Sequence, residues 1–290
     1  MYLPPPVRRR LDARLDQARE EGFRAGLAAA AARRSRERYR YVFVVTYGRS
    51  GSTLVQGLLN AFPRVLVRGE NDLYLLDLYR ALARVRAFRE LHGEHGSRNV
   101  VSAFYGLKAI RRSAFMQAMN DVVTTGVVGN LDADDYDVIG FKEVVWHRIE
   151  PEETAAFFDT MDKAFPGVRY VLNTRDVERV LGSGFWREAD ADEARALIER
   201  VVEIQDHLRA TRPDRVHDVR YEELTGPDPD ARDDVVRRLG EFVTGAPVTP
   251  SVLASAREVL ATGHGPFPFA RQDPDHQHTE PQHSDGSVAD

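Results

Sequence analysis

The chain has 290 residues, of which 42% are hydrophobic and 29% charged, and its formal net charge is −5. This composition predicts a globular protein with one substantial core, and the acidic balance argues against a nucleic-acid binder. The absence of Cys excludes disulfides, thiolate metal sites and cysteine nucleophiles. No apolar run reaches the ~18 residues of a membrane span, so we expect a cytoplasmic protein.

Residues 1–40 form a basic N-terminal extension with a helical pattern. They hold eleven Arg and five acidic residues, whereas the rest of the chain is acidic. The loose helical spacing of their apolar side chains predicts a solvated helix that lies against the domain. The alternative is contact with anionic membrane lipid or an acidic partner. Interspersed acidic residues disfavour that alternative; they are Asp12, Asp16, Glu20 and Glu21.

The stretch after this extension predicts an anion-binding loop. Val42–Val45 is typical of a strand buried on both faces, and Thr53–Leu59 has the apolar spacing of a helix. A turn of Gly and Ser residues joins the two. The N–H groups of such a turn converge, and the helix N-terminus adds about half a positive charge. The residues expected to hold an anionic group are Arg49, Ser50, Gly51, Ser52 and Thr53.

Beyond the loop, strands alternate with helices along the chain. Further strands are expected at residues 64–68, 137–142, 168–174 and 215–221. Helices are expected at residues 73–91, 104–123, 151–165, 175–185, 188–211, 228–242 and 250–262. This alternation predicts an α/β domain over residues 41–263, P-loop-like and three-layered, with a mainly parallel sheet of about five strands. Its ligands should lie at the carboxyl ends of the strands.

Two segments stand apart from this pattern. The connection between the second and third expected strands is far longer than a crossover needs, so residues 72–135 are expected to form a helical cap over the site. Residues 264–290 are rich in Pro, Gly, Asp, Gln and His and are predicted to be a disordered tail.

The loop sequence discriminates between classes of anion. A nucleoside-triphosphatase loop has Lys at the position taken here by Ser52, whereas the cation of this loop stands earlier, at Arg49. No apolar run ending in Asp offers an obvious second Mg²⁺ ligand. The sequence Gly48-Arg-Ser-Gly-Ser-Thr-Leu54 resembles the 5′-phosphosulfate loop of the sulfotransferases that use 3′-phosphoadenosine-5′-phosphosulfate (PAPS).

Three further stretches, each at the end of an expected strand, resemble the same family. Arg175, followed eight residues later by Ser183, is similar to the 3′-phosphate site, and two helical turns can bring both to one point. Tyr221-Glu-Glu-Leu224 is similar to the segment whose Tyr lies near the adenine. Glu70 resembles the proposed base of the branch that contains tyrosylprotein and some bacterial carbohydrate sulfotransferases.

The chain also departs from the family pattern. Cytosolic sulfotransferases carry Lys-Thr-His after the third strand, where this chain has Lys142-Glu143-Val144, so their His base is missing. We expect Lys142 either to support the bridging or sulfuryl oxygens or to lie at the strand end in solvent. The Arg-Lys-Gly segment near the family's C-terminus is also missing, and Arg257 and Arg271 are alternative substitutes.

The resemblance spans residues 41–245 and implies a PAPS-dependent sulfotransferase that needs no metal. Arg49 and the N–H groups of residues 50–53 would hold the phosphosulfate, and Glu70 would take the proton of an acceptor hydroxyl. We expect Glu70 to end the strand beside the loop. The alternative is that Glu70 pairs with Arg49 or Arg68 and only orders the loop. Only three of the forty basic residues are Lys, an Arg bias typical of bacterial genomes rich in G and C.

Two other classes of protein stay open. A P-loop kinase acting on a small molecule would bind ATP–Mg²⁺. A non-catalytic member of the fold would be a binding protein held to membranes by the basic extension. The acceptor could be a small molecule, a sugar or a peptide, and nothing in residues 72–135 distinguishes between them.

Overall fold

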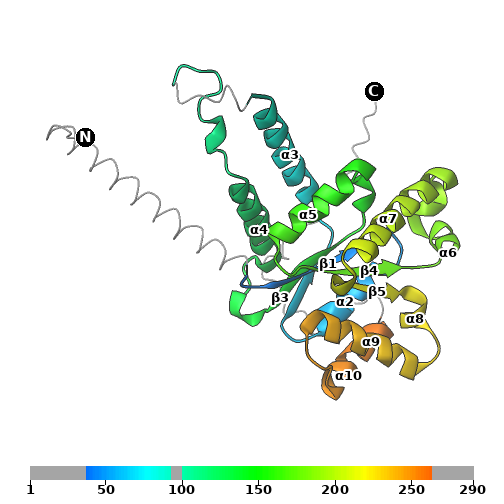
Figure 1. Ribbon diagram of the computed structural model, residues 1–290. Helices are drawn as coiled ribbons and strands as arrows, with labels where there is room; N and C mark the ends of the chain where they lie inside the picture. The colour runs from blue at the N-terminus through cyan, green and yellow to red at the C-terminus, as the bar shows by residue number, and fades with distance from the viewer. Residues whose placement is uncertain (1–36, 93–99, 263–290) are drawn as a thin grey trace, which may run out of the picture.

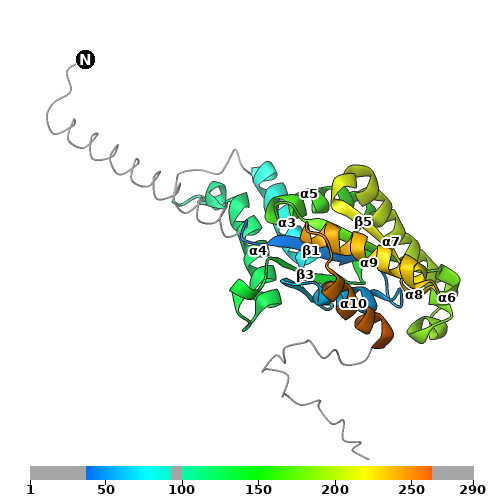
Figure 2. The ribbon, with the colours of Figure 1, turned by 90° about the horizontal axis from the view of Figure 1, so that it is seen from below.

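The computed structural model describes residues 37–92 and 100–262. Most of the predicted basic extension, residues 1–40, and all of the predicted tail, residues 264–290, lie outside the described residues. The described part consists of a central sheet between two layers of helices (Figures 1 and 2).

The sheet has five strands, all parallel, in the order β2-β3-β1-β4-β5. They are β1 (Arg40–Val45), β2 (Val65–Arg68), β3 (Val138–Glu143), β4 (Arg169–Thr174) and β5 (Val216–Arg220). The predicted parallel α/β fold is therefore confirmed. One expectation about its order is wrong. Because β3 lies between β2 and β1, the strand that precedes Glu70 is not adjacent to the strand that precedes the anion-binding loop. Strand order depends on tertiary packing, which the pattern of a single strand does not encode.

Burial of β1 on both faces explains its continuous apolar sequence. Val42 and Val44 belong to one hydrophobic cluster, whereas Phe43 and Val45 belong to the cluster on the opposite face. All four side chains are essentially inaccessible to solvent. Alternate residues of a strand face opposite sides, so the central strand of a three-layer domain needs apolar side chains throughout.

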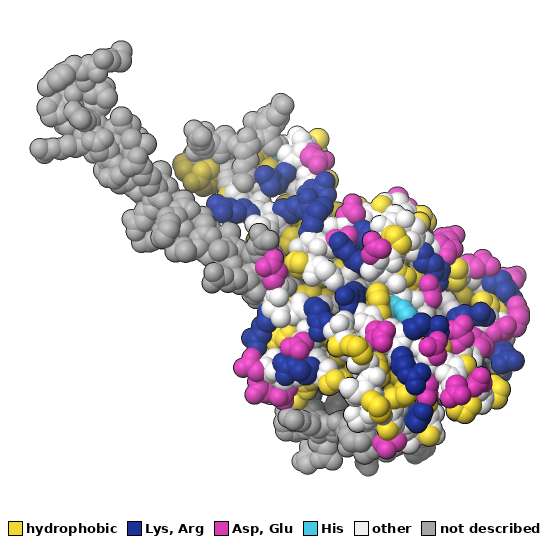
Figure 3. Space-filling view, turned by 60° about the horizontal axis from the view of Figure 1, so that its bottom comes forward, with side chains coloured by type: hydrophobic (Ala, Val, Ile, Leu, Met, Phe, Trp, Pro, Cys, Tyr) yellow, Lys and Arg dark blue, Asp and Glu magenta, His cyan; other side chains and the backbone are white. Residues whose placement is uncertain are grey.

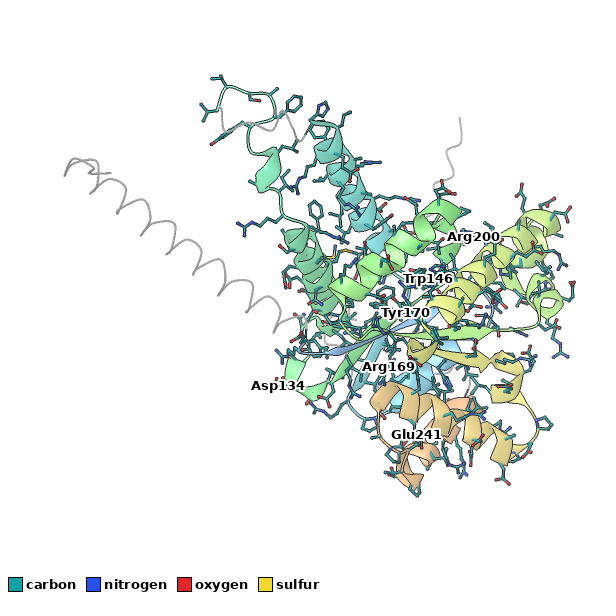
Figure 4. The ribbon with its side chains drawn as sticks, in the orientation of Figure 1. Asp134, Trp146, Arg169, Tyr170, Arg200 and Glu241 are labelled. Carbon is teal, nitrogen blue, oxygen red and sulfur yellow. The ribbon has the colours of Figure 1, made fainter. Side chains whose placement is uncertain are left out.

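Helices cover both faces of the sheet (Figures 1 and 2). One layer contains α2 (Ser52–Ala61), the short α8 (Tyr221–Thr225), α9 (Pro229–Thr244) and α10 (Pro250–Thr262). The other contains α3 (Tyr74–His92), α4 (Arg112–Val128), α5 (Thr154–Ala164), the short α6 (Val177–Leu181) and α7 (Ala191–Thr211). In Figure 4, Trp146 and Tyr170 lie between the sheet and the second layer, and both are fully buried. None of the helices in the described residues combines the length and apolar character needed to cross a bilayer.

The helices α3 and α4 form a hairpin between β2 and β3, within the segment predicted to be a helical cap. Near the sheet the hairpin joins the core through Met119 and Val123 of α4. Its far half projects from the body (Figure 1) and leaves Phe88 and Leu91 46% and 72% exposed. Lys and Arg side chains gather on this projecting part in Figure 3. The hairpin is thus a layer of the core at one end and a projection at the other, and its function as a cap stays a prediction.

Two of the predicted helices differ most from their expected bounds. The helix predicted over residues 104–123 begins at Arg112, after a 3-10 helix at Leu107–Ala109, and runs on to Val128. The helix predicted over residues 175–185 is restricted to Val177–Leu181. Gly182 is its C-cap, with its N–H donated to the carbonyls of Glu178 and Val180, and the extended Ser183 then leads into a 3-10 helix at Gly184–Glu188.

Candidate active site

The residues predicted to form the site lie at one edge of the sheet, because the carboxyl ends of parallel strands meet there. Each of the five strands contributes one part: Glu70 follows β2, Lys142 lies near the end of β3, the loop of residues 46–51 follows β1, Arg175 follows β4, and Tyr221 follows β5. The strand order therefore places the base candidate and the lysine on one side of the loop. Arg175 and Tyr221 lie on the other side.

Buried hydroxyl and amide groups fix the loop after β1. The Thr46 and Ser50 hydroxyl oxygens are 2.6 Å apart, and Ser50 donates to the Asn173 side-chain oxygen at 2.9 Å. Thr46 donates to the Asn173 backbone carbonyl at 2.9 Å. All three residues are fully buried. The Ser50 hydroxyl thus bonds within the protein, and the role of Ser50 in holding an anion stays a prediction.

Asn173 is a site residue that the sequence analysis missed. It lies in β4, and its Nδ2 donates to the carbonyl of Val219 in β5 at 3.3 Å. Together with its contacts to Thr46 and Ser50, this bond connects the β1 loop to two neighbouring strands. A buried polar side chain needs hydrogen-bond partners. The signal that could have identified Asn173 is therefore a single amide within the apolar run of β4.

Gly51, Tyr221 and Arg175 are packed together. Gly51 has a φ of 84°, and a Cβ at this position would lie 2.1 Å from the Tyr221 ring. The Arg175 guanidinium lies 4.3 Å from the centroid of the same ring. Arg175 Nη1 donates to the carbonyl of Arg49 at 3.0 Å, and its buried Nε has no partner among the described residues. Residues from three strand ends, predicted separately, thus meet at one point.

The segment after α6 packs on the β1 loop. Trp186 Nε1 donates to the carbonyl of Gly48 at 3.0 Å. The exposed Arg49 side chain lies against Gly184, where a Cβ would be 2.7 Å from Arg49 Nε. Ser183 is the neighbour of Gly184, and its hydroxyl donates to a carbonyl of α6 at 2.8 Å. The sequence analysis did not single out Trp186, which anchors the segment that carries Ser183.

Two further side chains fix the position of Arg175. The buried Tyr47 hydroxyl donates to the Arg175 carbonyl at 2.7 Å and accepts its N–H at 3.0 Å. Burial raises the pKa of Tyr47, so the hydroxyl keeps its proton. Glu222, the residue after Tyr221, accepts the N–H of Asp176 at 2.9 Å. The backbone around Arg175 is therefore held from both the loop after β1 and α8.

On the other side of the loop, Glu70 forms an ion pair with Lys142. The Lys142 Nζ atom is in direct contact with Glu70 Oε1. Lys142 is 4% exposed, which overturns the alternative of a lysine in solvent, whereas the Glu70 side chain is half exposed. The cation that pairs with Glu70 is thus Lys142, not Arg49 or Arg68 as the alternative expectation had it. Arg68 directs its Nε to the carbonyl of Val127 at 2.8 Å.

Metal ligation is not indicated in this part of the molecule. The described residues contain no group of three or more His, Cys, Asp or Glu side chains arranged to hold a metal ion. The first titratable side chain after β3 is that of His147, which lies in a 3-10 helix at Trp146–Arg148. Burial lowers the pKa of His147, so its neutral form is favoured.

The model of the sulfotransferase family matches residues 41–244 of the chain. This match covers most of the sequence, so the chain belongs to the sulfotransferase family, as the resemblance of its loop predicted. Transfer of a sulfuryl group is the general activity of this family. No curated protein sequence matches the chain.

The solved structures that are similar to this one include two mycobacterial sulfotransferases. Sulfotransferase STF9 from Mycobacterium avium is 17% identical, with a TM-score of 0.41, and the similarity covers 79% of this chain and 69% of that one. Sulfotransferase STF1 from Mycobacterium tuberculosis H37Rv is 16% identical, with a TM-score of 0.37, and the similarity covers 77% of this chain and 71% of that one.

Proposed function

We propose that the protein transfers the sulfuryl group of PAPS to an acceptor hydroxyl, with Glu70 as the general base. The observation that carries this proposal is the order of groups across the sheet edge. A half-exposed carboxylate, a buried lysine, a glycine-serine loop and an arginine over a tyrosine ring follow one another across five strands. In this proposal, proton acceptance and nucleotide binding lie on opposite sides of the loop that follows β1.

The residues at the ends of β1, β4 and β5, which we call the loop side, fit an anionic nucleotide. Gly51 is the N-cap of α2, and no side chain caps this helix end, so its first N–H groups are available to an oxyanion. Arg49 stands beside them with an exposed side chain. The buried Nε of Arg175, which has no partner among the described residues, fits a site completed by another acceptor. Arg175 and Ser183 would hold the 3′-phosphate, and Tyr221 would lie near the adenine.

In the proposed reaction, PAPS supplies the activated sulfuryl group. Glu70 accepts the proton of the acceptor hydroxyl while that oxygen forms its bond to sulfur. Arg49 and the N–H groups of Ser52 and Thr53 stabilise the negative charge that the 5′-phosphate gains as its bond to sulfur breaks. Lys142 lies on β3, between Glu70 and the loop, and would support the sulfuryl oxygens. At sulfur one S–O bond forms and one breaks, and Glu70 releases the acceptor's proton to solvent before the next turnover.

The rival functions make different demands on the site. A P-loop kinase for a small molecule needs a loop lysine, and Ser52 takes that position here. A non-catalytic binding protein needs no half-exposed carboxylate paired with a buried lysine. Burying a charge is costly, so a site that retains such a pair is expected to use it.

Nucleotide preference separates the sulfotransferase from the kinase. Adenosine 3′,5′-bisphosphate should raise the melting temperature more than an equal concentration of ATP–Mg²⁺. A ligand at a hundredfold excess over its Kd stabilises the folded state by about 2.7 kcal/mol. Equal shifts for the two ligands would refute the PAPS assignment and favour the kinase.

The base is tested by Glu70→Gln, which keeps the size of the side chain and removes its proton acceptor. Release of sulfate from PAPS, with water as the acceptor, needs no knowledge of the natural acceptor. This rate should fall by about 10²–10⁴-fold while bisphosphate binding stays unchanged. Glu178→Gln is the matched control, because Glu178 is an exposed glutamate paired with Arg195 on the surface. A Glu70→Gln protein with wild-type turnover would exclude the base role.

A further inference from the structure

Glu143, the residue after Lys142, is a buried carboxylate that the proposed reaction does not use. It is the last residue of β3 and is fully buried. Its Oε2 accepts the N–H groups of Asn71 and Leu73 at 2.9 and 3.1 Å. Its Oε1 accepts those of Val144 and Val145 at 2.7 and 3.2 Å. Two N–H groups on each oxygen satisfy this carboxylate, so it is not itself a base for a substrate.

Asn71 and Leu73 belong to the turn that connects Glu70 to α3. Asp72 and Leu73 have φ values of 61° and 53°, in the left-handed region. Such a conformation costs a residue other than glycine about 1–3 kcal/mol and persists only where the surroundings impose it. The Asn71 side chain accepts the Leu73 N–H at 3.1 Å, and Glu143 supplies the contacts from the sheet. Glu143 therefore fixes the turn in a conformation that its own residues disfavour.

Glu143 is itself anchored to the strand of the anion-binding loop. Trp146 Nε1 donates to the Glu143 backbone carbonyl at 2.8 Å and to the Val44 carbonyl of β1 at 3.2 Å. Trp146 is fully buried between the sheet and the second helix layer (Figure 4). In the β1–β3 ladder, Glu143 pairs with Val45, the residue before the loop. The position that Glu143 imposes on the turn is thus defined relative to that loop.

We propose that Glu143 is a positioning residue for Glu70. Two adjacent residues of β3 hold the same turn: Lys142 contacts the Glu70 carboxylate, and Glu143 holds the backbone that follows it. The base is thereby fixed relative to the loop that binds the sulfuryl donor. This inference rests on the proposed function, in which Glu70 takes the proton of the acceptor.

The first test is Glu143→Gln. The amide keeps the size of the side chain, but its NH₂ group must face one of the two pairs of N–H donors, so two of the four hydrogen bonds that join the turn to the end of β3 are lost whichever way the amide is turned. Displacement of a reacting group by ~1 Å costs about 10²-fold in rate, and sulfate release from PAPS should fall to this extent. Bisphosphate affinity should be unchanged, because the loop side is not altered. Amide hydrogen exchange should rise at residues 70–73 and stay unchanged at residues 46–53.

Two further variants serve as controls. Asp162→Asn removes the charge of another partly buried carboxylate, which pairs with Arg212 and Arg215 before the start of β5, and should cost stability without changing turnover. Glu143→Asp serves if the Gln variant does not fold. It keeps the charge but is one methylene shorter, so it cannot reach both pairs of N–H groups, and it should lower turnover in the same way.

The decisive comparison is the double variant Glu70→Gln/Glu143→Gln. If Glu143 acts through Glu70, its substitution should have almost no further effect on turnover once the base is removed. Equal losses in both backgrounds would overturn the positioning role and leave the base intact. Wild-type turnover of the Glu143→Gln variant would also overturn the positioning role and leave the base role of Glu70 intact. Wild-type turnover of Glu70→Gln alone would refute the base, and with it a residue that positions the base.

Discussion

The two sides of the site are held together by different forces. On the loop side, formed by β1, β4 and β5, neutral hydrogen bonds among Thr46, Ser50 and Asn173 fix the anion-binding loop. On the base side, formed by β2 and β3, charged groups fix the turn around Glu70. Neutral networks stabilise the folded state when every partner is satisfied, whereas a buried ion pair is often no better than an apolar replacement. Substitutions on the loop side should therefore lower the free energy of unfolding and the bisphosphate affinity together. Substitutions on the base side should lower turnover with little change in the free energy of unfolding.

The largest effect is expected for Gly51→Ala on the loop side. The new Cβ would overlap the Tyr221 ring at 2.1 Å and would be held at a φ of 84°. We expect a loss of more than ~3 kcal/mol in the free energy of unfolding, measured by urea denaturation, and loss of bisphosphate binding. Gly167→Ala is the matched control, because Gly167 has a φ of 72° and a Cβ added there would have nothing within 4 Å. Similar losses for both variants would show that backbone strain, not contact with Tyr221, governs Gly51.

A smaller loss is expected for Asn173→Ala, which leaves the buried Ser50 hydroxyl without its amide partner. A buried polar group without a partner costs ~1–3 kcal/mol. The free energy of unfolding and the bisphosphate affinity, measured by calorimetry, should both fall because the same bonds fix the loop. A variant that loses stability and still binds the bisphosphate normally would break the proposed coupling.

Lys142→Met on the base side should change stability by less than ~1 kcal/mol, because removal of a buried charge offsets loss of the ion pair. Its partner Glu70 is half exposed and remains solvated. Sulfate release from PAPS should nevertheless fall strongly. A large loss of stability in this variant would show that charges stabilise the base side as neutral bonds stabilise the loop side.

The smallest effect concerns pH and involves both sides. Burial lowers the pKa values of His147, after β3, and His217, in β5, and it also lowers that of His207 in α7. The unfolded chain therefore binds more protons than the folded one, from the lowered values up to the ordinary value near 6.5. The free energy of unfolding should rise with pH across that window and level off above it. His147→Gln should flatten part of this slope, measured by urea denaturation at several pH values, and an unchanged slope would exclude His147 as a contributor.

Local patterns were sufficient to predict most of the fold. The apolar run of β1, the Gly and Ser turn and the start of α2 are contiguous in sequence, so strand, loop and helix could be predicted together. Glu70, Lys142, Arg175 and Tyr221 could be placed at one edge because each follows or ends a strand. The caps of α6 are Asp176 and Gly182, and the early end of this helix was not predicted.

The sequence did not show which side chains of the site pair with one another. The insertion of β3 between β2 and β1 decides that Glu70 meets Lys142 rather than Arg49. The inward direction of the Ser50 hydroxyl depends on Asn173, which is 123 residues away in the chain. Both outcomes result from tertiary packing between segments that carry no shared pattern.

The hairpin of α3 and α4 has a mechanical consequence for the base. Tyr74, the first residue of α3, follows the Glu70 turn directly, and the helix continues without interruption to His92. A helix of 19 residues is ~28 Å long, so a tilt of about 5° at its first turn moves its far end by ~2.5 Å. A small rotation of α3 beside Glu70 would therefore move its projecting end further than it moves the turn. Since the chain has no Cys, a cysteine at Leu91 would be its single thiol, and a probe attached there would report motion at the base from outside the site.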